Sequence, residues 1–282
     1  MKIKITSDST CDLSPELIKK YDIDILPLYV VMGDDTLKDG IEATPKDIYE
    51  FVDKTGVLPK TSAPNLSDFI DLFKKYTEQG FEVIHFNISS DFSSSYATAC
   101  LAAAEVGGVR IVDTRNLSTG SGLVVLHACE MAQSGASAEE IAKECSELTG
   151  RVEASFVVDS IDYLHKGGRC SSVAALGANL LKLKPCIEVI NGKMKSAKKY
   201  RGLIDRVILN YVTDRLLGRD DIDKHRIFIT HTKCSKHIVD DVRKKISELS
   251  PGFDEILETT AGCTITSHCG PYTLGILFIR KG

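Results

Sequence analysis

The chain has 282 residues, 43% of them hydrophobic and 26% charged, which is ordinary for a globular protein and too apolar for a chain that stays disordered. Its 35 Lys and Arg and 39 Asp and Glu give a net charge of −4, so no excess of positive charge attracts nucleic acid, and we expect no such partner. At roughly 100–200 residues per domain, the length predicts two domains that share or flank a cleft, with one compact unit as the alternative.

The first half of the chain alternates strand-length apolar runs with helix-length segments, a pattern typical of parallel strands joined by crossover helices. Ile3–Thr6 predicts the first strand, and Ser14 followed by Pro15 predicts a helix that ends near Tyr21. The ends of the strands should face one crevice. Two more strands and three more helices are predicted in this half: Phe81–Ile88, Ser93–Val106, Val109–Asp113, Thr119–Gln133 and Ala138–Thr149.

Gly150 and Arg151 interrupt this pattern, and Ala154–Val158 predicts a new strand, so we place a domain boundary between residues 153 and 154. Residues 1–153 then form an N-terminal α/β domain with hydroxyl-rich strand ends, and residues 154–282 form a C-terminal α/β domain with a hairpin and closing strands. Asn191-Gly192 predicts the hairpin, because both turn residues must take positive φ. The predicted elements of the second domain are Pro185–Ile190, Lys193–Tyr200, Leu203–Leu217, Arg226–Thr230, Ser235–Leu249, Glu255–Thr259 and Leu274–Arg280.

The start of the chain alternates polar and apolar residues, unlike the continuous apolar stretch of a secretory signal, and no segment approaches the roughly 18 consecutive apolar residues of a membrane span. Nine cysteines are scattered without a C-x-x-C pair, which favours reduced, buried thiols over a disulfide framework. We therefore expect a cytoplasmic protein, and a transient contact with a membrane surface is left open.

Hydroxyl-bearing residues gather where the predicted strands end. In open α/β sheets these ends, together with the helix N-termini that follow, form the ligand crevice, and their free backbone N–H groups favour an anion. A single cluster is also explained by helix capping without any ligand. Taken together, the clusters predict an anion held by neutral donors: Thr6–Thr10, Thr61 and Ser62, Ser89 and Ser90, Ser93 to Ser95, and Ser118–Ser121.

Nucleotide and hydrolase patterns are weak or absent. No P-loop occurs, and Gly120–Gly122 lacks the third small residue of a dinucleotide fingerprint, because Val125 stands in its place. No G-x-S-x-G nucleophile elbow occurs either. Since unrelated folds can assemble a catalytic triad, an esterase or thioesterase built on Ser93 and His268 remains the alternative function.

Two further groups of residues have a structural and a functional interpretation. His231, Cys234 and His237 have spacing that resembles a metal site, but a structural zinc site needs four ligands and a catalytic site three, so we predict no metal. Gly168 and Arg169, in the segment 166–169, form either a plain surface turn or a tight turn that holds a guanidinium in place. Cys170 and the remaining cysteines receive no catalytic role.

His268 lies just before the last predicted strand, where Gly270-Pro271 would direct the imidazole out of the end of the sheet. Together with the motifs above, this segment resembles the DegV family of bacterial fatty-acid-binding proteins, over nearly the whole chain. The motifs that carry the resemblance are Thr6–Leu13, Thr61–Pro64, Ser93–Tyr96, Leu164–Arg169 and His268–Pro271.

The resemblance implies two α/β domains with a long-chain fatty acid between them and neither catalysis nor a cofactor. It also implies a role as the binding subunit of a fatty-acid kinase, whose separate ATP-binding subunit converts the carboxylate into an acyl phosphate for phospholipid synthesis. Matched by position, the carboxylate contacts fall on Thr61, Ser93 and His268. Arg201, after the second hairpin strand, resembles the basic residue of the family that engages the kinase.

The chain departs from the pattern of the family at the predicted pocket. Ser94 replaces its usual glycine and Ser95 its threonine, so the loop would differ if that glycine needs positive φ. Tyr272 replaces the final glycine of the histidine motif and would add a ring near His268. The remaining residues that we predict in the pocket or its loops are Ser62, Gly168 and Arg169, with the far wall drawn from residues 172–183.

Overall fold

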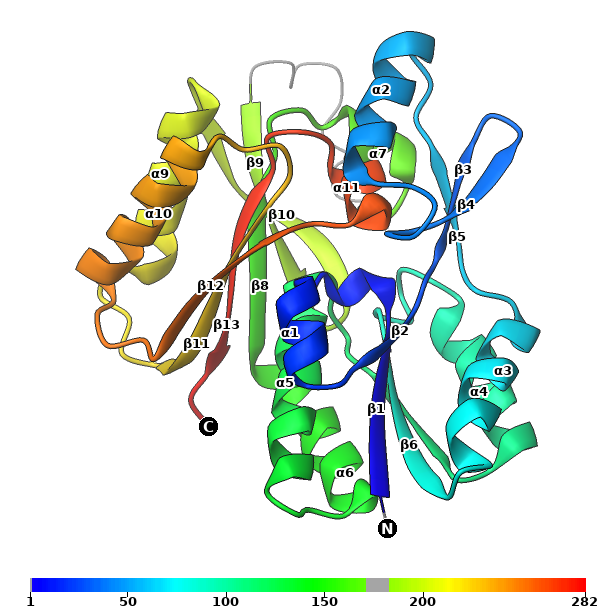
Figure 1. Cartoon of the computed structure of the whole chain (residues 1–282). Coiled ribbons are helices and arrows are strands. Elements are labelled where there is room, and N and C mark those ends of the chain that lie inside the picture. The colour runs from blue at the N-terminus through cyan, green and yellow to red at the C-terminus, as the bar shows by residue number, and fades with distance from the viewer. Residues whose placement is uncertain (1, 171–182) are drawn as a thin grey trace.

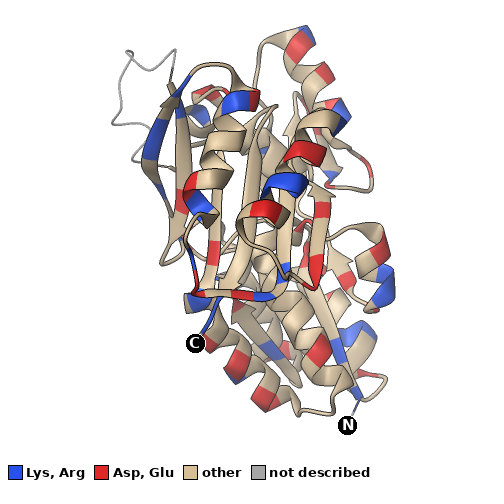
Figure 2. Ribbon diagram, turned by 90° about the vertical axis from the view of Figure 1, so that its left-hand side faces the viewer, with Lys and Arg blue, Asp and Glu red and all other residues tan. Residues whose placement is uncertain are grey.

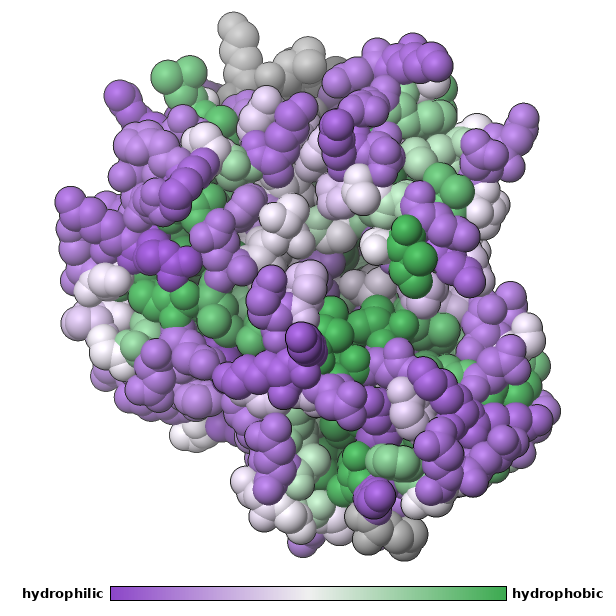
Figure 3. All heavy atoms as spheres, in the orientation of Figure 1, coloured by the Kyte–Doolittle hydropathy of each residue, from purple (hydrophilic) through white to green (hydrophobic). Residues whose placement is uncertain are grey.

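The structure is a computed structural model that describes residues 2–170 and 183–282 (Figure 1). In this part of the chain, helices and strands form three sheets with helices packed against the two larger ones, so the predicted α/β class is confirmed. The surface in the same orientation is mostly hydrophilic, with apolar side chains gathered near the middle of the face (Figure 3).

The first sheet has four strands in the order β2-β1-β6-β7, and all its pairs are parallel, as predicted. Its strands are β1 (Lys2–Asp8), β2 (Asp24–Leu26), β6 (Phe81–Asn87) and β7 (Val109–Asp113). The helices of this half are α1 (Pro15–Lys20), α2 (Pro45–Thr55), α3 (Leu66–Thr77), α4 (Ser95–Val106), α5 (Thr119–Gln133) and α6 (Ala138–Leu148).

The second sheet has six strands in the order β10-β9-β8-β13-β11-β12 and is mixed, with β11 and β12 parallel and the other pairs antiparallel. The hairpin is confirmed, because Asn191 and Gly192 have φ of 51° and 79° between β9 and β10. The strands are β8 (Val152–Val157), β9 (Leu183–Ile190), β10 (Lys193–Arg201), β11 (Ile222–His231), β12 (Glu255–Thr260) and β13 (Leu274–Arg280), and helices α9 (Ile204–Leu216) and α10 (Lys236–Leu249) pack side by side.

Several elements were not predicted. They include helices α2 and α3, a third sheet with the strand order β4-β3-β5, and the short helices α7 and α11. Helices α2 and α3 begin with capping boxes (Thr44 with Asp47, Asn65 with Asp68), a signal that would have predicted both. His268 therefore lies in the last turn of a helix and not in a loop at a sheet end. The elements are β3 (Tyr29–Met32), β4 (Asp35–Lys38), β5 (Lys60–Ser62), α7 (Asp162–Gly167), α11 (Cys263–Cys269) and the 3₁₀ turns η1 (Ser9–Cys11) and η2 (Thr149–Arg151).

Helix α5 is buried along most of its length and packs against strands of both larger sheets. One core cluster joins Phe86 and Leu126 of the first half to Phe228 and Leu277 of the second. A helix that is apolar on all sides needs such cover on every face. The boundary that we placed between residues 153 and 154 falls inside β8, and the division into two domains remains a prediction.

Candidate functional site

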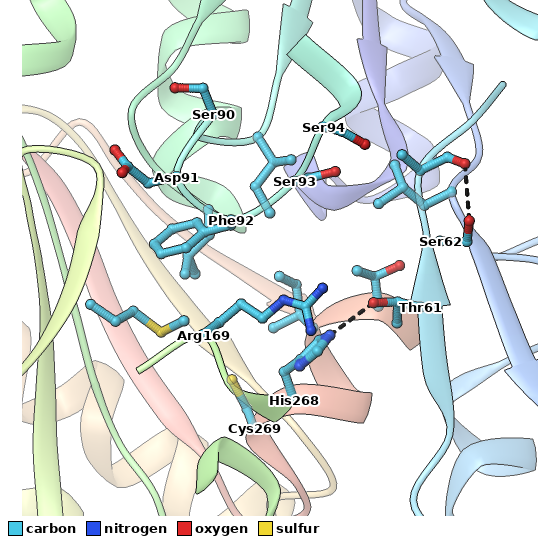
Figure 4. Close-up of a pocket in the computed structure, with 17 residues that line it drawn as sticks. Thr61, Ser62, Ser90, Asp91, Phe92, Ser93, Ser94, Arg169, His268 and Cys269 are labelled. Carbon is cyan, nitrogen blue, oxygen red and sulfur yellow. Dashed lines mark hydrogen bonds between the residues drawn. The ribbon is translucent and has the colours of Figure 1, made fainter. Parts of the chain in front are cut away.

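A cavity of about 570 Å³ lies where the loop after β6, strand β5, the end of α7, strand β10 and helix α11 meet (Figure 4). Cavities that take small molecules range from about 300 to 1,000 Å³ and combine a mostly apolar lining with a few polar groups. The apolar part of this lining comes from Leu28, Ala63, Ile88, Phe92, Leu117, Met194, Ile265 and Cys269.

Seven of the predicted residues line this cavity: Thr61, Ser62, Ser90, Ser93, Ser94, Arg169 and His268. The structure therefore brings together side chains that lie up to 207 residues apart in the sequence. The lining does not include Ser95, Gly168, Arg201 and Tyr272, nor does it include Ser89 or the predicted clusters Thr6–Thr10 and Ser118–Ser121. Of the predicted far wall, residues 172–182 lie outside the described residues, and Leu183 begins β9.

Thr61 and His268 form the polar centre of the cavity. Thr61 lies on β5 opposite Val30 of β3, and its Oγ1 is 2.8 Å from Nε2 of His268 on α11. Burial, with a smaller effect from the positive charge of Arg169, lowers the pKa of His268 to about 4. The imidazole is therefore neutral near pH 7 and acts as a hydrogen-bonding group instead of a cation.

Two buried carboxylates hold the start of α11, the helix that carries His268. The Asp39 carboxylate accepts hydrogen bonds from the backbone N–H of Cys263 at 2.8 Å and of Thr264 at 3.0 Å. The carboxyl group of Asp12 accepts a hydrogen bond from Gly262 N at 2.9 Å. These bonds satisfy N–H groups that a helix start leaves free. The sequence analysis identified neither residue, although Asp12 lies in the Thr6–Leu13 motif.

Ser93 lies in the loop between β6 and α4 and faces the cavity (Figure 4). Its Oγ accepts a hydrogen bond from Ser95 N at 3.1 Å and is 2.9 Å from Ser95 Oγ, so Ser95 supports Ser93 from outside the lining. Ser94 has φ −75°, a conformation open to any residue. The loop here does not need a glycine at this position.

Segment 166–169 combines a helix end with a cation at the cavity. Gly168 has φ 69° and ends α7 as a left-handed cap, which is the usual role of glycine there. Arg169 follows it, donates from Nη1 to Gly167 O at 2.8 Å, and extends beside His268 (Figure 4). The described lining thus includes the guanidinium of Arg169 and the carboxylate of Asp91 besides its neutral donors.

Two predicted residues lie elsewhere. Tyr272 is 42% exposed in the turn after α11 and has φ 59°, so its ring is not part of the cavity lining. Arg201 is the last residue of β10, paired with Leu183, and is exposed. It therefore belongs to the edge strand β10 itself, whereas the sequence predicted that it follows this strand.

The geometry does not show the pairing that an esterase requires. Ser93 Oγ is bonded to Ser95, and His268 Nε2 to Thr61. Among the described residues, Nδ1 of His268 has no hydrogen-bond partner, so no carboxylate orients the ring as in a catalytic triad.

The three residues whose spacing resembles a metal site each contact a different group. His231 lies 3.4 Å from Glu258, Cys234 donates to Thr273 O, and His237 lies 3.5 Å from Asp241 on the surface. Across residues 2–170 and 183–282, no three His, Cys, Asp or Glu side chains gather as a metal site would need. In the same ranges, no helix is long and apolar enough to cross a membrane.

Comparisons with known proteins agree over the full length. A family model described as "Uncharacterised protein, DegV family" matches residues 2–281. A fatty acid-binding protein of Thermotoga maritima is 35% identical over 287 aligned residues, which cover 98% of this chain and 96% of that protein.

Solved structures show the same fold. A DegV family protein of Thermus thermophilus, described by its fatty acid binding, is 30% identical with a TM-score of 0.89. The match covers 99% of this chain and 100% of that one. A stearic acid-binding protein of Eubacterium ventriosum is 28% identical with a TM-score of 0.83, and the match covers 100% of this chain and 99% of that one.

Proposed function

Because this chain belongs to the DegV family, we propose that it binds a long-chain fatty acid in the cavity, with the carboxylate at Thr61, Ser93 and His268. The observation that carries this proposal is the hydrogen-bonded pair of Thr61 and His268, 2.8 Å apart, at a cavity about half of whose other lining residues are apolar. The relatives from Thermotoga maritima and Thermus thermophilus, both described as binding fatty acids, support it.

The apolar tail supplies most of the affinity. A chain of about 16 carbons buries about 14 methylenes at about 0.8 kcal/mol each, or roughly 11 kcal/mol before the cost of association. The polar groups then have the task of orientation. A few donors on one carboxylate oxygen leave the other free, whereas a bidentate arginine would occupy both. Arg169 Nη1 already donates to Gly167 O, so this nitrogen is not free to form half of a bidentate contact with the carboxylate.

The protein should retain its ligand through purification. Native mass spectrometry should show a mass increment that denaturing extraction identifies as a fatty acid. A delipidated sample should bind stearate saturably, with one molecule per chain. Repeated recovery of no lipid, together with no saturable binding of stearate or oleate, would refute the proposal.

The carboxylate contacts are tested at Ser93. Ser93→Ala removes a hydrogen bond to a charged acceptor, worth roughly 1.5–3 kcal/mol, so stearate affinity should fall by about 10- to 150-fold. Ser62→Ala is the matched control, because this hydroxyl also lines the cavity but donates to the backbone at Ala63 O. Equal affinities of the two variants would place the carboxylate elsewhere.

We further propose that the protein presents the carboxylate to a separate ATP-dependent kinase subunit, which docks at the edge strand β10. The charged side chains of β10 are all basic and exposed: Lys193, Lys195, Lys198, Lys199 and Arg201. On the side of the molecule that includes this strand, acidic and basic residues otherwise intermingle (Figure 2). An acidic partner surface is the chemical complement, and such charges govern encounter and register more than fold stability.

Charge reversal separates binding of the lipid from its presentation. Arg201→Glu should leave stearate affinity and Tm unchanged while slowing acyl-phosphate formation when the kinase subunit is limiting. Lys195→Glu makes the same charge change on the same strand and should have a smaller effect. Full acyl-phosphate formation by Arg201→Glu would refute the role of Arg201, and loss of stearate binding would move that residue to the pocket.

A further inference from the structure

Helices α7 and α11 approach each other closely where Gly167 meets His268. A Cβ on Gly167 would lie 2.4 Å from Nδ1 of His268, so the imidazole nitrogen occupies the space that any side chain would fill. Gly167 is the last residue of α7 and lacks the positive φ that Gly168 has. Its backbone conformation therefore does not call for glycine, and within a helix glycine is less stable than alanine. The close approach is what requires it.

The two nitrogens of His268 have unequal surroundings. Nε2 lies 2.8 Å from Thr61 Oγ1, whereas Nδ1 is enclosed and has no hydrogen-bond partner among the described residues. A neutral imidazole carries one proton, on either nitrogen. A proton on Nδ1 would be a buried donor without an acceptor and would point at the backbone of Gly167. A lone pair in the same place meets the Cα–H of Gly167, which is a weak donor.

The position of that proton decides what Thr61 can do. With the proton on Nε2, the ring donates to Thr61 Oγ1, and the hydroxyl hydrogen of Thr61 remains free to donate to an anion. With the proton on Nδ1, Thr61 would have to donate to Nε2, and its lone pairs would face the carboxylate. Hydrogen bonds that run in one direction also polarise and strengthen each other.

We propose that Gly167 is a positioning residue for the carboxylate site: the space left by its missing side chain seats Nδ1 and keeps the proton of His268 on Nε2. The hydrogen bonds then run from His268 to Thr61 and from Thr61 to the fatty-acid carboxylate. This rests on the proposed fatty-acid binding at Thr61 and His268. The charge of Arg169 beside the ring opposes a second proton on it and so preserves the neutral form.

The wild-type protein tests the position of the proton directly. With ¹⁵N-labelled histidine, long-range ¹H–¹⁵N correlation spectra at pH 7 should show Nδ1 of His268 as an unprotonated nitrogen and Nε2 as a protonated one, in the delipidated and in the stearate-loaded protein. His268→Gln identifies the resonances. A protonated Nδ1 would overturn the proposal, whatever the protein binds.

Gly167→Ala tests the positioning. The added methyl group should displace the ring, so stearate affinity should fall at least tenfold while circular dichroism shows a folded protein. Gly150→Ala is the control, because a Cβ there meets nothing within 4 Å and its φ is not positive. Unchanged affinity in Gly167→Ala would overturn the proposal. Failure of the wild-type protein to bind any fatty acid would instead refute the proposed function, and the spectra would still report the proton.

Discussion

At the scale of single residues, Tyr272 illustrates how a position in a family motif can be set by the backbone. Its φ of 59° lies in the left-handed region, where a Cβ is crowded and which glycine adopts freely. Its N–H donates to Thr232 O at 2.9 Å, which holds the turn between α11 and β13 in this shape. The tyrosine that stands in place of the family's glycine therefore strains the turn without entering the cavity.

Two substitutions at Tyr272 isolate this strain. Tyr272→Gly and Tyr272→Ala both remove the ring, and they differ only in the Cβ. Left-handed backbone costs an L-residue roughly 1–2 kcal/mol, and the greater freedom of glycine in the unfolded chain offsets part of it, so the glycine variant should be more stable by about 0.5–1 kcal/mol. Urea denaturation of the two variants measures this, and a more stable alanine variant would contradict it.

Asp12 is a buried carboxylate with an unusual protonation equilibrium. It accepts hydrogen bonds from Ser118 Oγ and Gly262 N, which favour the charged form. Burial nevertheless outweighs them, and with repulsion from Asp39 and Asp8 it raises the pKa of Asp12 from 3.8 to about 8. The folded protein therefore holds a proton that the unfolded chain releases at neutral pH.

The raised pKa of Asp12 sets the direction in which stability changes with pH. Because the folded pKa lies above the unfolded one, the contribution of Asp12 to stability is full below about pH 4 and is lost as pH rises to about 8. Relative to Asp12→Asn, which cannot titrate, the free energy of unfolding of the wild-type protein should decline between pH 5 and pH 8 and level off above. Urea denaturation of both proteins at pH 5, 7 and 9 measures the difference. Parallel pH profiles would show that Asp12 ionises normally.

At the scale of elements, the tip of the β9–β10 hairpin is fastened to the loop that carries Ser93. Arg115 donates to Ser90 Oγ at 3.0 Å and to the hairpin carbonyl of Asn191, and it lies 2.8 Å from the Asp91 carboxylate. Next to it, Ser89 Oγ donates to Gly192 O at 2.8 Å. One guanidinium therefore connects the second sheet to a loop of the first, at the edge of the cavity.

Removing this connection should loosen the loop. Arg115→Ala leaves charged and carbonyl acceptors without their donor and should lower the free energy of unfolding by roughly 1–3 kcal/mol. Amide hydrogen exchange should accelerate in residues 89–94, and stearate affinity should fall. Arg110→Ala is the control, since Arg110 pairs with Glu82 between β6 and β7, away from the cavity. Unchanged exchange in Arg115→Ala would show that the loop holds its shape alone.

At the scale of the whole molecule, the cavity is an interface between parts of the fold. Thr61 comes from the smallest sheet, Ser93 from a loop after the parallel sheet, Met194 from the mixed sheet, and His268 from a helix held by Asp39. A ligand in contact with all of them binds the folded state and not the unfolded chain, so it adds to global stability.

Fatty acid should therefore raise the melting temperature. Free stearate at 100 times its Kd adds about 2.7 kcal/mol, which corresponds to a Tm rise of roughly 4–6 °C for a protein of this size. Thermal melts of delipidated protein with increasing stearate measure it. Ser93→Ala should need a higher stearate concentration for the same rise. A Tm independent of stearate would contradict binding to the folded state.

Elements with a strong local signal could be predicted from the amino-acid sequence. Helix α5 runs from Thr119 to Gln133 as predicted, and the hairpin follows from Asn191-Gly192, because turn chemistry and apolar periodicity act over a few residues. The family motifs also placed Thr61, Ser93 and His268 among the residues of one cavity. The motifs identified these three residues because they combine side chains that are close in space, which the periodicity of the sequence alone cannot reveal.

The way in which those residues meet depends on contacts between segments that are far apart in the sequence. Helix α11 has 7 residues, too few for a periodic signal, and it is held by Asp39, whose carboxylate reaches Cys263 across 224 residues of sequence. The small third sheet and the contact of Gly167 with His268 are likewise long-range. Such contacts form because burial and hydrogen bonding are satisfied only in the complete fold, and neither leaves a trace in the spacing of neighbouring residues.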